Sequence, residues 1–274
     1  MVSILLSTYN GELYLNELIN SILNQSYSSW ELFIRDDGSK DSTNIIIDTY
    51  CVKYPEKIFR IPSFDENVGS GKSFMKLLES VDSDYYMFCD QDDIWLNNKI
   101  ELSMKKMEEL ESCEKGKAIA VFTDLKVVDE KLNLISDSLW KYSNISAAYS
   151  KDFYRMLAWG CPAYGCTMLF NSKVKQYVLP FPEWKFHDLW TILIISKKGI
   201  VDYISFPTIL YRQHTCNVTG AHQKNNKKYY LSRFLHMNEL IIEQRKLFLM
   251  YKDLPFNISL VKILSLIHIS EPTR

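Results

Sequence analysis

The sequence predicts an α/β fold in which a mostly parallel sheet is flanked by helices, followed by a C-terminal helical extension. Three observations predict it. Short apolar runs alternate with amphipathic helical segments through the first third of the 274 residues. Each run is continuous, as the buried strands of a parallel sheet are, and ends in polar residues. The chain has no internal repeat or low-complexity linker, so we expect one continuous domain before the extension.

The first four predicted strands are residues 2–7, 30–34, 58–61 and 85–89. The helices predicted between them are residues 12–23, 41–54 and 71–80. Leu15, Leu18 and Ile22 recur at helical spacing in the first helix. Asp41 or Ser42 is a candidate N-cap for the second helix. This alternation indicates parallel strands joined by helical crossovers, so ligands are expected beyond the carboxyl ends of the strands.

The rest of the chain is less regular. The strands predicted there are residues 118–123, 125–128, 166–170, 203–206 and 208–211, and the helices are 97–111, 188–195 and 229–251. Residues 134–160 show no clear period, and we expect a helix and a loop over the site. We place the main domain at residues 1–222 and the helical extension at residues 223–263.

Residues 264–274 read LSLIHISEPTR. This string resembles the translation of a transposase adapter used in sequencing libraries, and an ordinary polar tail is the alternative. We expect the native sequence to end near Ile263, and we leave the tail out of the fold prediction.

Composition and charge exclude several classes of protein. The formal net charge of −1, from 32 Lys and Arg against 33 Asp and Glu, lacks the basic excess of a nucleic-acid-binding protein. No apolar run reaches the about 18 residues of a membrane-spanning helix, and the first residues lack the basic region of a signal peptide. The six cysteines are scattered without metal-ligand spacing, so we expect free thiols and a cytoplasmic location.

One motif is deceptive. Residues 69–73 read GSGKS, which looks like the end of a phosphate-binding P-loop. That motif requires a glycine five positions before its last glycine, and Glu66 stands there. A nucleoside-triphosphate hydrolase is therefore disfavoured.

The acidic run Asp90-Gln91-Asp92-Asp93 follows a predicted apolar strand directly. In an extended segment Asp90 and Asp92 point to one side. Two such carboxylates can hold a hard divalent cation that shares its ligands with a substrate diphosphate. A solvated acidic turn is the alternative. Because the run stands at a strand end, the sequence favours neither the cation site nor the solvated turn.

Three further segments carry polar groups suited to a site. Asp36 begins a DDGS turn after the second strand, where a carboxylate can accept a base imide N–H or simply close a β-turn. Asp188 follows His187 at a helix start, where it can take a proton from a hydroxyl or cap the helix. His214 ends the segment Tyr211-Arg212-Gln213-His214, and histidine is a frequent metal ligand.

Together these pieces resemble family 2 glycosyltransferases, which have the GT-A fold, a Rossmann-like fold of nucleotide-diphospho-sugar transferases. The resemblance covers about residues 1–220. It is carried, in order, by STYN with Glu12, then DDGS, NVG and DQDD. The later segments DQDDIW, GCTM, HD and YRQH with Asn217 and Gly220 look like rhamnosyltransferases of bacterial cell-surface polysaccharides.

The resemblance implies a role for each matching residue. The base and ribose of a nucleotide-sugar would contact Thr8, Tyr9, Glu12 and Asp36. Asn67 and Lys72 would lie near the nucleotide. Asp90 would contact the ribose or the sugar, and Asp92 would bind the donor through a metal. The metal, Mg²⁺ or Mn²⁺, would be held by Asp92 and His214, and Asp188 would be the catalytic base.

The reaction implied is a single displacement that inverts the anomeric centre of a sugar, with L-rhamnose from dTDP-rhamnose as the donor. A UDP-hexose or UDP-N-acetylhexosamine donor remains open, as does a non-catalytic nucleotide-sugar-binding relative. The acceptor would be a glycan or a lipid-linked glycan. The QxxRW motif of processive synthases is absent. The helix 229–251 either packs on the domain or lies on the inner face of the cell membrane.

Overall fold

A computed structural model describes residues 1–63, 67–159, 161–182 and 186–215, together with Asn217, Ala221 and Ser259. The predicted helix 229–251, the extension 223–263 and the tail 264–274 lie outside the described residues, apart from Ser259. None of the described helices is both long enough and apolar enough to cross a membrane.

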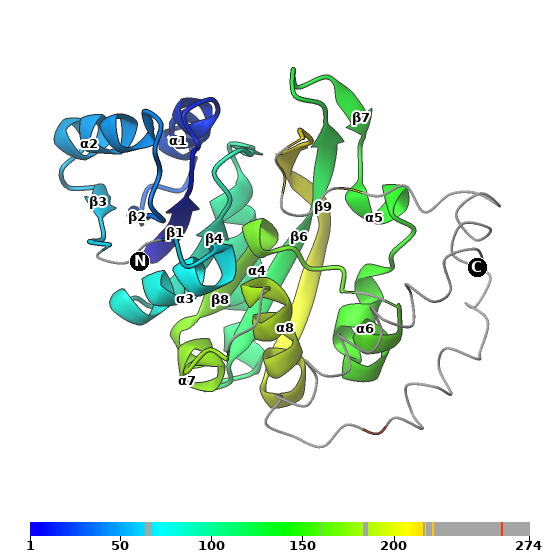
Figure 1. The fold of residues 1–274 in the computed structure, drawn as a ribbon. Coiled ribbons are helices and arrows are strands. Elements are labelled where there is room, and N and C mark those ends of the chain that lie inside the picture. Colours follow the sequence, from blue (N-terminus) through cyan, green and yellow to red (C-terminus); the bar gives the residue numbers. More distant parts are fainter. Residues whose placement is uncertain are drawn as a thin grey trace.

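The described part of the chain forms one nine-stranded sheet (Figure 1). The strands are β1 (Val2–Thr8), β2 (Trp30–Asp36), β3 (Ile58–Arg60), β4 (Tyr85–Cys89), β5 (Ile94–Trp95), β6 (Ile119–Val128), β7 (Leu134–Ser136), β8 (Met168–Asn171) and β9 (Ile200–Arg212). Their order is β3-β2-β1-β4-β8-β6-β9-β5, and β7 pairs with β6. All strands except β5, β7 and β8 run in one direction. The predicted mostly parallel α/β fold is confirmed.

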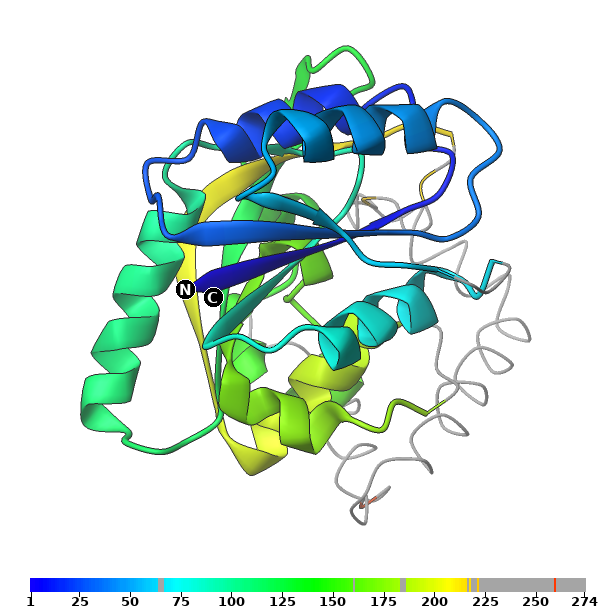
Figure 2. The ribbon, with the colours of Figure 1, turned by 90° about the vertical axis from the view of Figure 1, so that its left-hand side faces the viewer.

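Helices cover both faces of the sheet. They are α1 (Leu15–Leu23), α2 (Thr43–Lys53), α3 (Ser70–Ser80), α4 (Lys99–Cys113), α5 (Leu139–Tyr142), α6 (Phe153–Trp159), α7 (Lys175–Val178) and α8 (His187–Lys198). Helices α1, α2 and α4 contribute to one hydrophobic cluster, and α3, α6, α7 and α8 to the other. Figure 2 shows these two groups on opposite sides of the sheet. The sheet is therefore the middle layer of three.

Strand β1 shows how the sequence serves both layers. Alternate side chains of a strand point to opposite faces. Val2, Ile4 and Leu6 belong to the cluster with α1, whereas Leu5 belongs to the cluster with α3. All four are fully buried, and each contributes about 1.5 to 3 kcal/mol through its removal from water. An unbroken apolar run is what this double burial requires.

Several predicted boundaries are wrong. Helix α1 begins at Leu15 rather than at residue 12, because residues 12–14 form a turn in which the Tyr14 amide donates to the Gly11 carbonyl. The two strands predicted at 203–206 and 208–211 are one strand, β9, which passes Pro207 at an irregularity of its ladder with β6. A proline has no N–H to donate there.

The structure also differs from the prediction in β6 and in residues 134–160. Residues 118–123 and 125–128 are one strand, β6, with a register shift beside Asp124. The irregular region 134–160 contains β7, α5, a 3₁₀ turn at Ala147–Lys151 and α6. Short elements of three to seven residues give no readable period, which is why the sequence did not reveal them.

Candidate active site

A cavity of about 750 Å³ lies beyond the carboxyl ends of β1, β2 and β4, where the topology predicts a ligand. The predicted site residues that line it are Thr8, Tyr9, Asn67, Lys72, Asp90, Asp92 and Asp188. They come from four separated segments of the chain. The lining does not include Glu12, Asp36 or His214.

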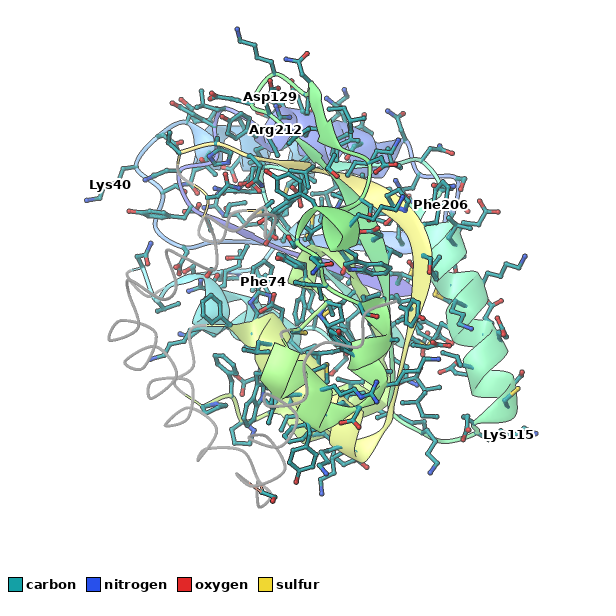
Figure 3. All side chains as sticks on the ribbon, turned by 90° about the vertical axis from the view of Figure 1, so that its right-hand side faces the viewer. Lys40, Phe74, Lys115, Asp129, Phe206 and Arg212 are labelled. Atoms are coloured by element: carbon teal, nitrogen blue, oxygen red, sulfur yellow. The ribbon has the colours of Figure 1, made fainter. Side chains whose placement is uncertain are left out.

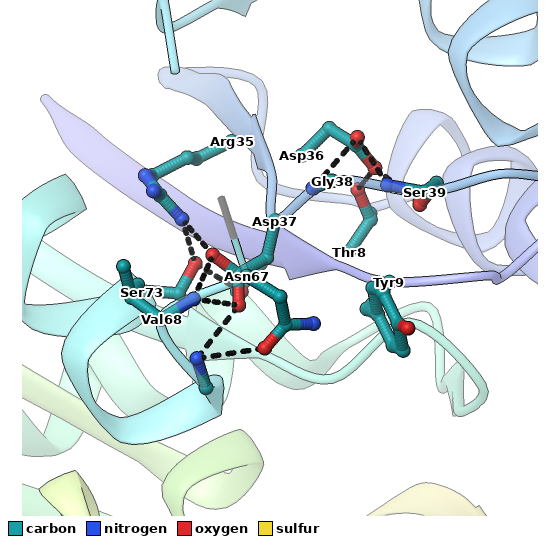
Figure 4. A network of polar contacts seen from close by, with 12 residues as sticks. Thr8, Tyr9, Arg35, Asp36, Asp37, Gly38, Ser39, Asn67, Val68 and Ser73 are labelled. Atoms are coloured by element: carbon teal, nitrogen blue, oxygen red, sulfur yellow. Dashed lines mark hydrogen bonds and ion pairs between the residues drawn. The ribbon is translucent and has the colours of Figure 1, made fainter. Parts of the chain in front are cut away.

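Asp36 closes the turn after β2. Its Oδ1 accepts a hydrogen bond from Thr8 Oγ1 at 3.0 Å, and its Oδ2 accepts from the amides of Gly38 and Ser39 at 3.2 and 2.8 Å (Figure 4). Glu12 lies further out, where its Oε2 accepts from the Ser42 amide at 2.9 Å. The turn-closing alternative therefore describes Asp36 in this structure, and the nucleotide contacts of Asp36 and Glu12 stay predictions.

A buried ion pair between Arg35 and Asp37 anchors the loop that contains Asn67, Val68 and Gly69. The sequence did not reveal this pair. Arg35 Nη1 lies 2.6 Å from Asp37 Oδ1, and both side chains are 2% exposed. The Asp37 carboxylate also accepts from the amides of Val68 and Gly69, at 3.1 and 2.9 Å to Oδ2 (Figure 4). Asp37 thus ties β2 to the segment that carries Asn67 into the cavity. The charged run Arg35-Asp36-Asp37 at the end of the strand was the available signal.

The P-loop-like segment leads into helix α3. Gly69 has a φ of +83°, which favours glycine. In a P-loop the final Ser hydroxyl binds Mg²⁺. Here the Ser73 hydroxyl is buried and bonded to Arg35 Nη1 at 2.7 Å and to Ser7 Oγ at 2.6 Å. This arrangement gives no support to a hydrolase of nucleoside triphosphates.

The acidic run after β4 forms a turn at residues 91–92 rather than the extended segment expected from its spacing. Gln91 fastens this turn to β1, because its side-chain amide accepts from the Tyr9 amide at 2.8 Å and donates to the Tyr9 carbonyl at 3.0 Å. Asp90 and Asp92 nevertheless both line the cavity. The turn, not an extended strand, presents the two carboxylates.

His214 meets Asp92 from the far end of the described chain. His214 Nε2 lies 2.8 Å from Asp92 Oδ2, although the two residues are 122 positions apart. Arg212 holds this contact in place: its Nε donates to the Asp92 carbonyl at 3.0 Å, and its guanidinium is paired with Glu17 of α1. Figure 3 shows Arg212 where β9 ends. The sequence marked this segment for His214 and missed the buried arginine beside it.

Asp90 carries the electrostatic signature of the site. Burial, together with the nearby charges of Asp92 and Asp188, raises the pKa of Asp90 to about 7. Clustered carboxylates of this kind favour a cation between them. Because hard divalent cations prefer oxygen ligands, the residues fit Mg²⁺ or Mn²⁺ at the cavity face of the turn.

Asp90 also belongs to a second polar cluster, together with Asp93 and Cys166. The ligand atoms of Asp90, Asp93 and Cys166 lie within 4.8 Å of one another, and Lys99 Nζ lies 4.6 Å from the centre of the Trp95 ring. Burial raises the pKa of the Cys166 thiol well above its ordinary value and lowers that of Lys99 to about 8. A protonated thiol is a poor ligand for a hard cation. Asp90 and Asp92 are therefore the better pair for such an ion.

Asp188 lies in the first turn of α8 and lines the cavity. Its Oδ2 accepts from the Gly165 amide at 3.1 Å, and its Oδ1 accepts from the Leu189 amide at 2.7 Å. The neighbouring His187 is buried, and this burial lowers its pKa to about 4, so the imidazole is neutral near pH 7. A half-buried carboxylate that faces the cavity can accept a proton from a bound hydroxyl.

Comparison with known proteins identifies the family of the chain. The profile of glycosyl transferase family 2 matches residues 3–177. The chain is 28% identical over 237 residues to the dTDP-rhamnosyl transferase RfbG of Shigella flexneri, covering 82% of this chain and 76% of that protein. It is 29% identical over 197 residues to an uncharacterized glycosyltransferase of Rickettsia typhi, covering 69% of this chain and 57% of that protein.

Two solved structures share the fold. S. aureus TarS in complex with UDP-GlcNAc is 18% identical with a TM-score of 0.57, covering 84% of this chain and 63% of that chain. The mannosyltransferase PcManGT of Pyrobaculum calidifontis, in complex with GDP-Man and Mn²⁺, is 16% identical with a TM-score of 0.58, covering 97% and 68%. The GT-A fold is confirmed. Since the family profile also matches more than half of its length, the chain belongs to glycosyl transferase family 2.

Proposed function

We propose that this chain is an inverting, metal-dependent glycosyltransferase that moves L-rhamnose from dTDP-rhamnose to a hydroxyl group of a cell-surface glycan. The observation that carries the proposal is the placement of Asp188 and of the acidic turn with Asp90 and Asp92 around one cavity. A base and a cation site on the same cavity are what a single displacement needs. The similarity to the S. flexneri dTDP-rhamnosyl transferase supports rhamnose as the sugar.

In this proposal Asp188 accepts the proton of the acceptor hydroxyl. The hydroxyl oxygen attacks C1 of the donor sugar as the bond from C1 to the diphosphate oxygen breaks. The electron pair of that bond leaves with the nucleoside diphosphate. No enzyme nucleophile is required, because one displacement inverts C1 directly. The Gly165 and Leu189 amides hold the Asp188 carboxylate while it takes the proton.

Asp90 and Asp92, which both line the cavity, would hold the divalent cation, and the cation would offset the negative charge of the leaving diphosphate. His214, expected from the sequence as the second ligand beside Asp92, is outside the cavity lining, and we assign it instead to orienting the Asp92 carboxylate, with Nε2 2.8 Å from Oδ2. Asn67 and Lys72 also line the cavity, near the start of α3. We assign these two residues to the nucleotide, along with Thr8 and Tyr9 at the end of β1.

The acceptor proposed is a glycan, free or lipid-linked, used at the cytoplasmic face of the cell membrane. The glycan class rests on relatives whose names refer to polysaccharides, such as the putative teichuronic acid biosynthesis glycosyltransferase TuaG of Bacillus subtilis, 35% identical over 109 residues. Those 109 residues are 40% of this chain and 42% of that protein. Fractionation of cells that produce the full chain tests the membrane association.

The decisive experiment is a donor screen with one variant. Purified chain is incubated with dTDP-rhamnose, UDP-glucose or UDP-GlcNAc and Mn²⁺, with water as the hydroxyl that attacks C1, and the released nucleotide is measured with and without EDTA. We expect release from dTDP-rhamnose that EDTA abolishes and that Asp188→Asn reduces by about 10² to 10⁴-fold. Asp137→Asn is the matched control, because Asp137 is an exposed carboxylate outside the cavity lining.

Each result has a separate meaning. Preference for UDP-glucose or UDP-GlcNAc overturns rhamnose and leaves the reaction type standing. Full activity in EDTA refutes the requirement for a metal. Undiminished activity of Asp188→Asn refutes the assignment of Asp188 as the base. Binding of dTDP without release from any donor favours a non-catalytic nucleotide-sugar-binding relative.

A further inference from the structure

We propose that Gly165 and His187 are positioning residues that form a rigid seat for Asp188, and that glycine is required at position 165 because a side chain there displaces the base. The proposal rests on the proposed function, since it takes Asp188 as the base. Neither residue exchanges a proton with the substrate in this scheme. They fix the orientation of the carboxylate relative to the cavity.

The first part of the seat is the Gly165 amide, which donates to Asp188 Oδ2 at 3.1 Å. Gly165 opens a 3₁₀ turn at Gly165–Thr167, directly before β8, so the central sheet holds this amide in place. The Leu189 amide binds the other oxygen, Oδ1, at 2.7 Å. Each carboxylate oxygen therefore has one backbone donor, and the plane of the carboxylate is set by the fold.

The second part is the space above Gly165. A Cβ atom built on Gly165 would lie 3.0 Å from His187 Nε2 and 3.2 Å from Asp188 Cβ. Both distances are tighter than ordinary van der Waals contact. The backbone of Gly165 is not in the left-handed region, in contrast to Gly38, Gly69 and Gly116. Glycine is thus required here for room, not for backbone conformation.

The third part is the rigidity of His187. It decides whether His187 or Asp188 moves when residue 165 gains a Cβ atom. The imidazole is stacked on Phe74, with ring centroids 4.1 Å apart, and lies edge-on to Phe88 at 4.6 Å. His187 is only 7% exposed, and Figure 3 shows Phe74 within the molecule. An imidazole packed on two aromatic rings cannot retreat. An added methyl group at position 165 therefore shifts the Asp188 side chain.

The predicted effect is a selective loss of turnover. A misplacement of about 1 Å at a reacting group can cost about 10²-fold in rate, so a shift of about 0.3 to 0.5 Å costs about four- to tenfold. Gly165→Ala is expected to lower kcat for dTDP release from dTDP-rhamnose by about four- to tenfold. The KM for dTDP-rhamnose and the Kd for dTDP stay within about twofold, because the nucleotide contacts lie elsewhere in the cavity.

Two controls separate positioning from general damage. Thr167→Ser removes one methyl group from the same turn and keeps the hydroxyl that donates to the Tyr164 carbonyl, so its kcat stays near that of the parent. A double-mutant cycle with His187→Ala tests the mechanism, because a shortened residue 187 lets the new methyl group fit. The fold loss caused by Gly165→Ala is expected to be smaller in the His187→Ala background than in the parent.

The outcomes distinguish this proposal from the proposed function. If Asp188→Asn abolishes release while Gly165→Ala keeps kcat within twofold, the base stands and the seat is overturned. An equal fold loss in both backgrounds, or a rise in KM with unchanged kcat, also overturns the seat. If Asp188→Asn retains activity, the base assignment fails and the seat fails with it.

Discussion

The buried pair of Arg35 and Asp37 offers the sharpest test of what supports the cavity wall. Asp37→Asn keeps the shape of the side chain and removes its charge. Asn keeps one acceptor oxygen, so its NH2 group faces either Arg35 Nη1, which lies 2.6 Å from Oδ1, or the amides of Val68 and Gly69, which bind Oδ2, and one of these donor sets loses its acceptor. A guanidinium that is 2% exposed loses the charge of Asp37 beside it. Breaking a buried pair in this way costs about 3 to 5 kcal/mol.

The assay is equilibrium unfolding in urea at pH 7, monitored by tryptophan fluorescence. Asp48→Asn is the matched control: Asp48 Oδ1 lies 2.5 Å from Arg60 Nη1, but these side chains are 62% and 38% exposed. An exposed pair contributes about 0 to 1 kcal/mol. We expect the unfolding midpoint to fall by about 1 M or more for Asp37→Asn and to change little for Asp48→Asn. Losses within about 1 kcal/mol of each other would refute the reasoning.

Two further predictions concern buried titratable groups. The pKa of His187 is lowered from 6.5 to about 4 by burial, so the unfolded chain binds the proton more tightly. The free energy of unfolding should fall by about 3 kcal/mol as the pH drops from about 6.5 to about 4, and His187→Gln should lack this component in urea titrations at several pH values. An unchanged pH slope in that variant would contradict it. Burial lowers the pKa of Lys99 to about 8, so its charge at pH 7 is costly, and Lys99→Met should raise the free energy of unfolding by about 1 to 3 kcal/mol. If Lys99→Met instead lowers the free energy of unfolding in thermal or urea experiments, the ammonium of Lys99 stabilises the fold.

The sequence predicted the sheet well where burial dictates composition. Strands β1 and β4 are buried on both faces, so their apolar runs were unbroken and easily recognised. The breaks placed at Asp124 and Pro207 were wrong because a polar residue or a proline can sit at a ladder irregularity without ending the strand. The antiparallel direction of β8 could not be read at all, since a buried run carries no signal for its direction.

The site shows the same division. Residues at or directly after the ends of strands, such as Thr8 and Asp90, reach the cavity as the topology requires. The supporting residues were hidden because their partners are distant in sequence. Arg212 binds the Asp92 carbonyl across 120 positions. The sequence suggested no role for Gln91, although its side chain bonds the turn to the Tyr9 backbone. Such contacts follow from the packing of strands, which residue spacing alone does not specify.

The parallel pairing of β6 with β9 also bears on how the chain is made. Thr123 and Thr208 share a hydrogen bond across 85 positions, so β6 leaves the ribosome long before the strand that covers its second edge. During that interval a long apolar strand presents unpaired backbone groups, the kind of edge on which nascent chains aggregate. Because His214 and Arg212 arrive with the same late strand, the acidic turn acquires its clamp only after β9 has emerged. The contacts that hold the acidic turn of the cavity therefore form only when β9 pairs with β6.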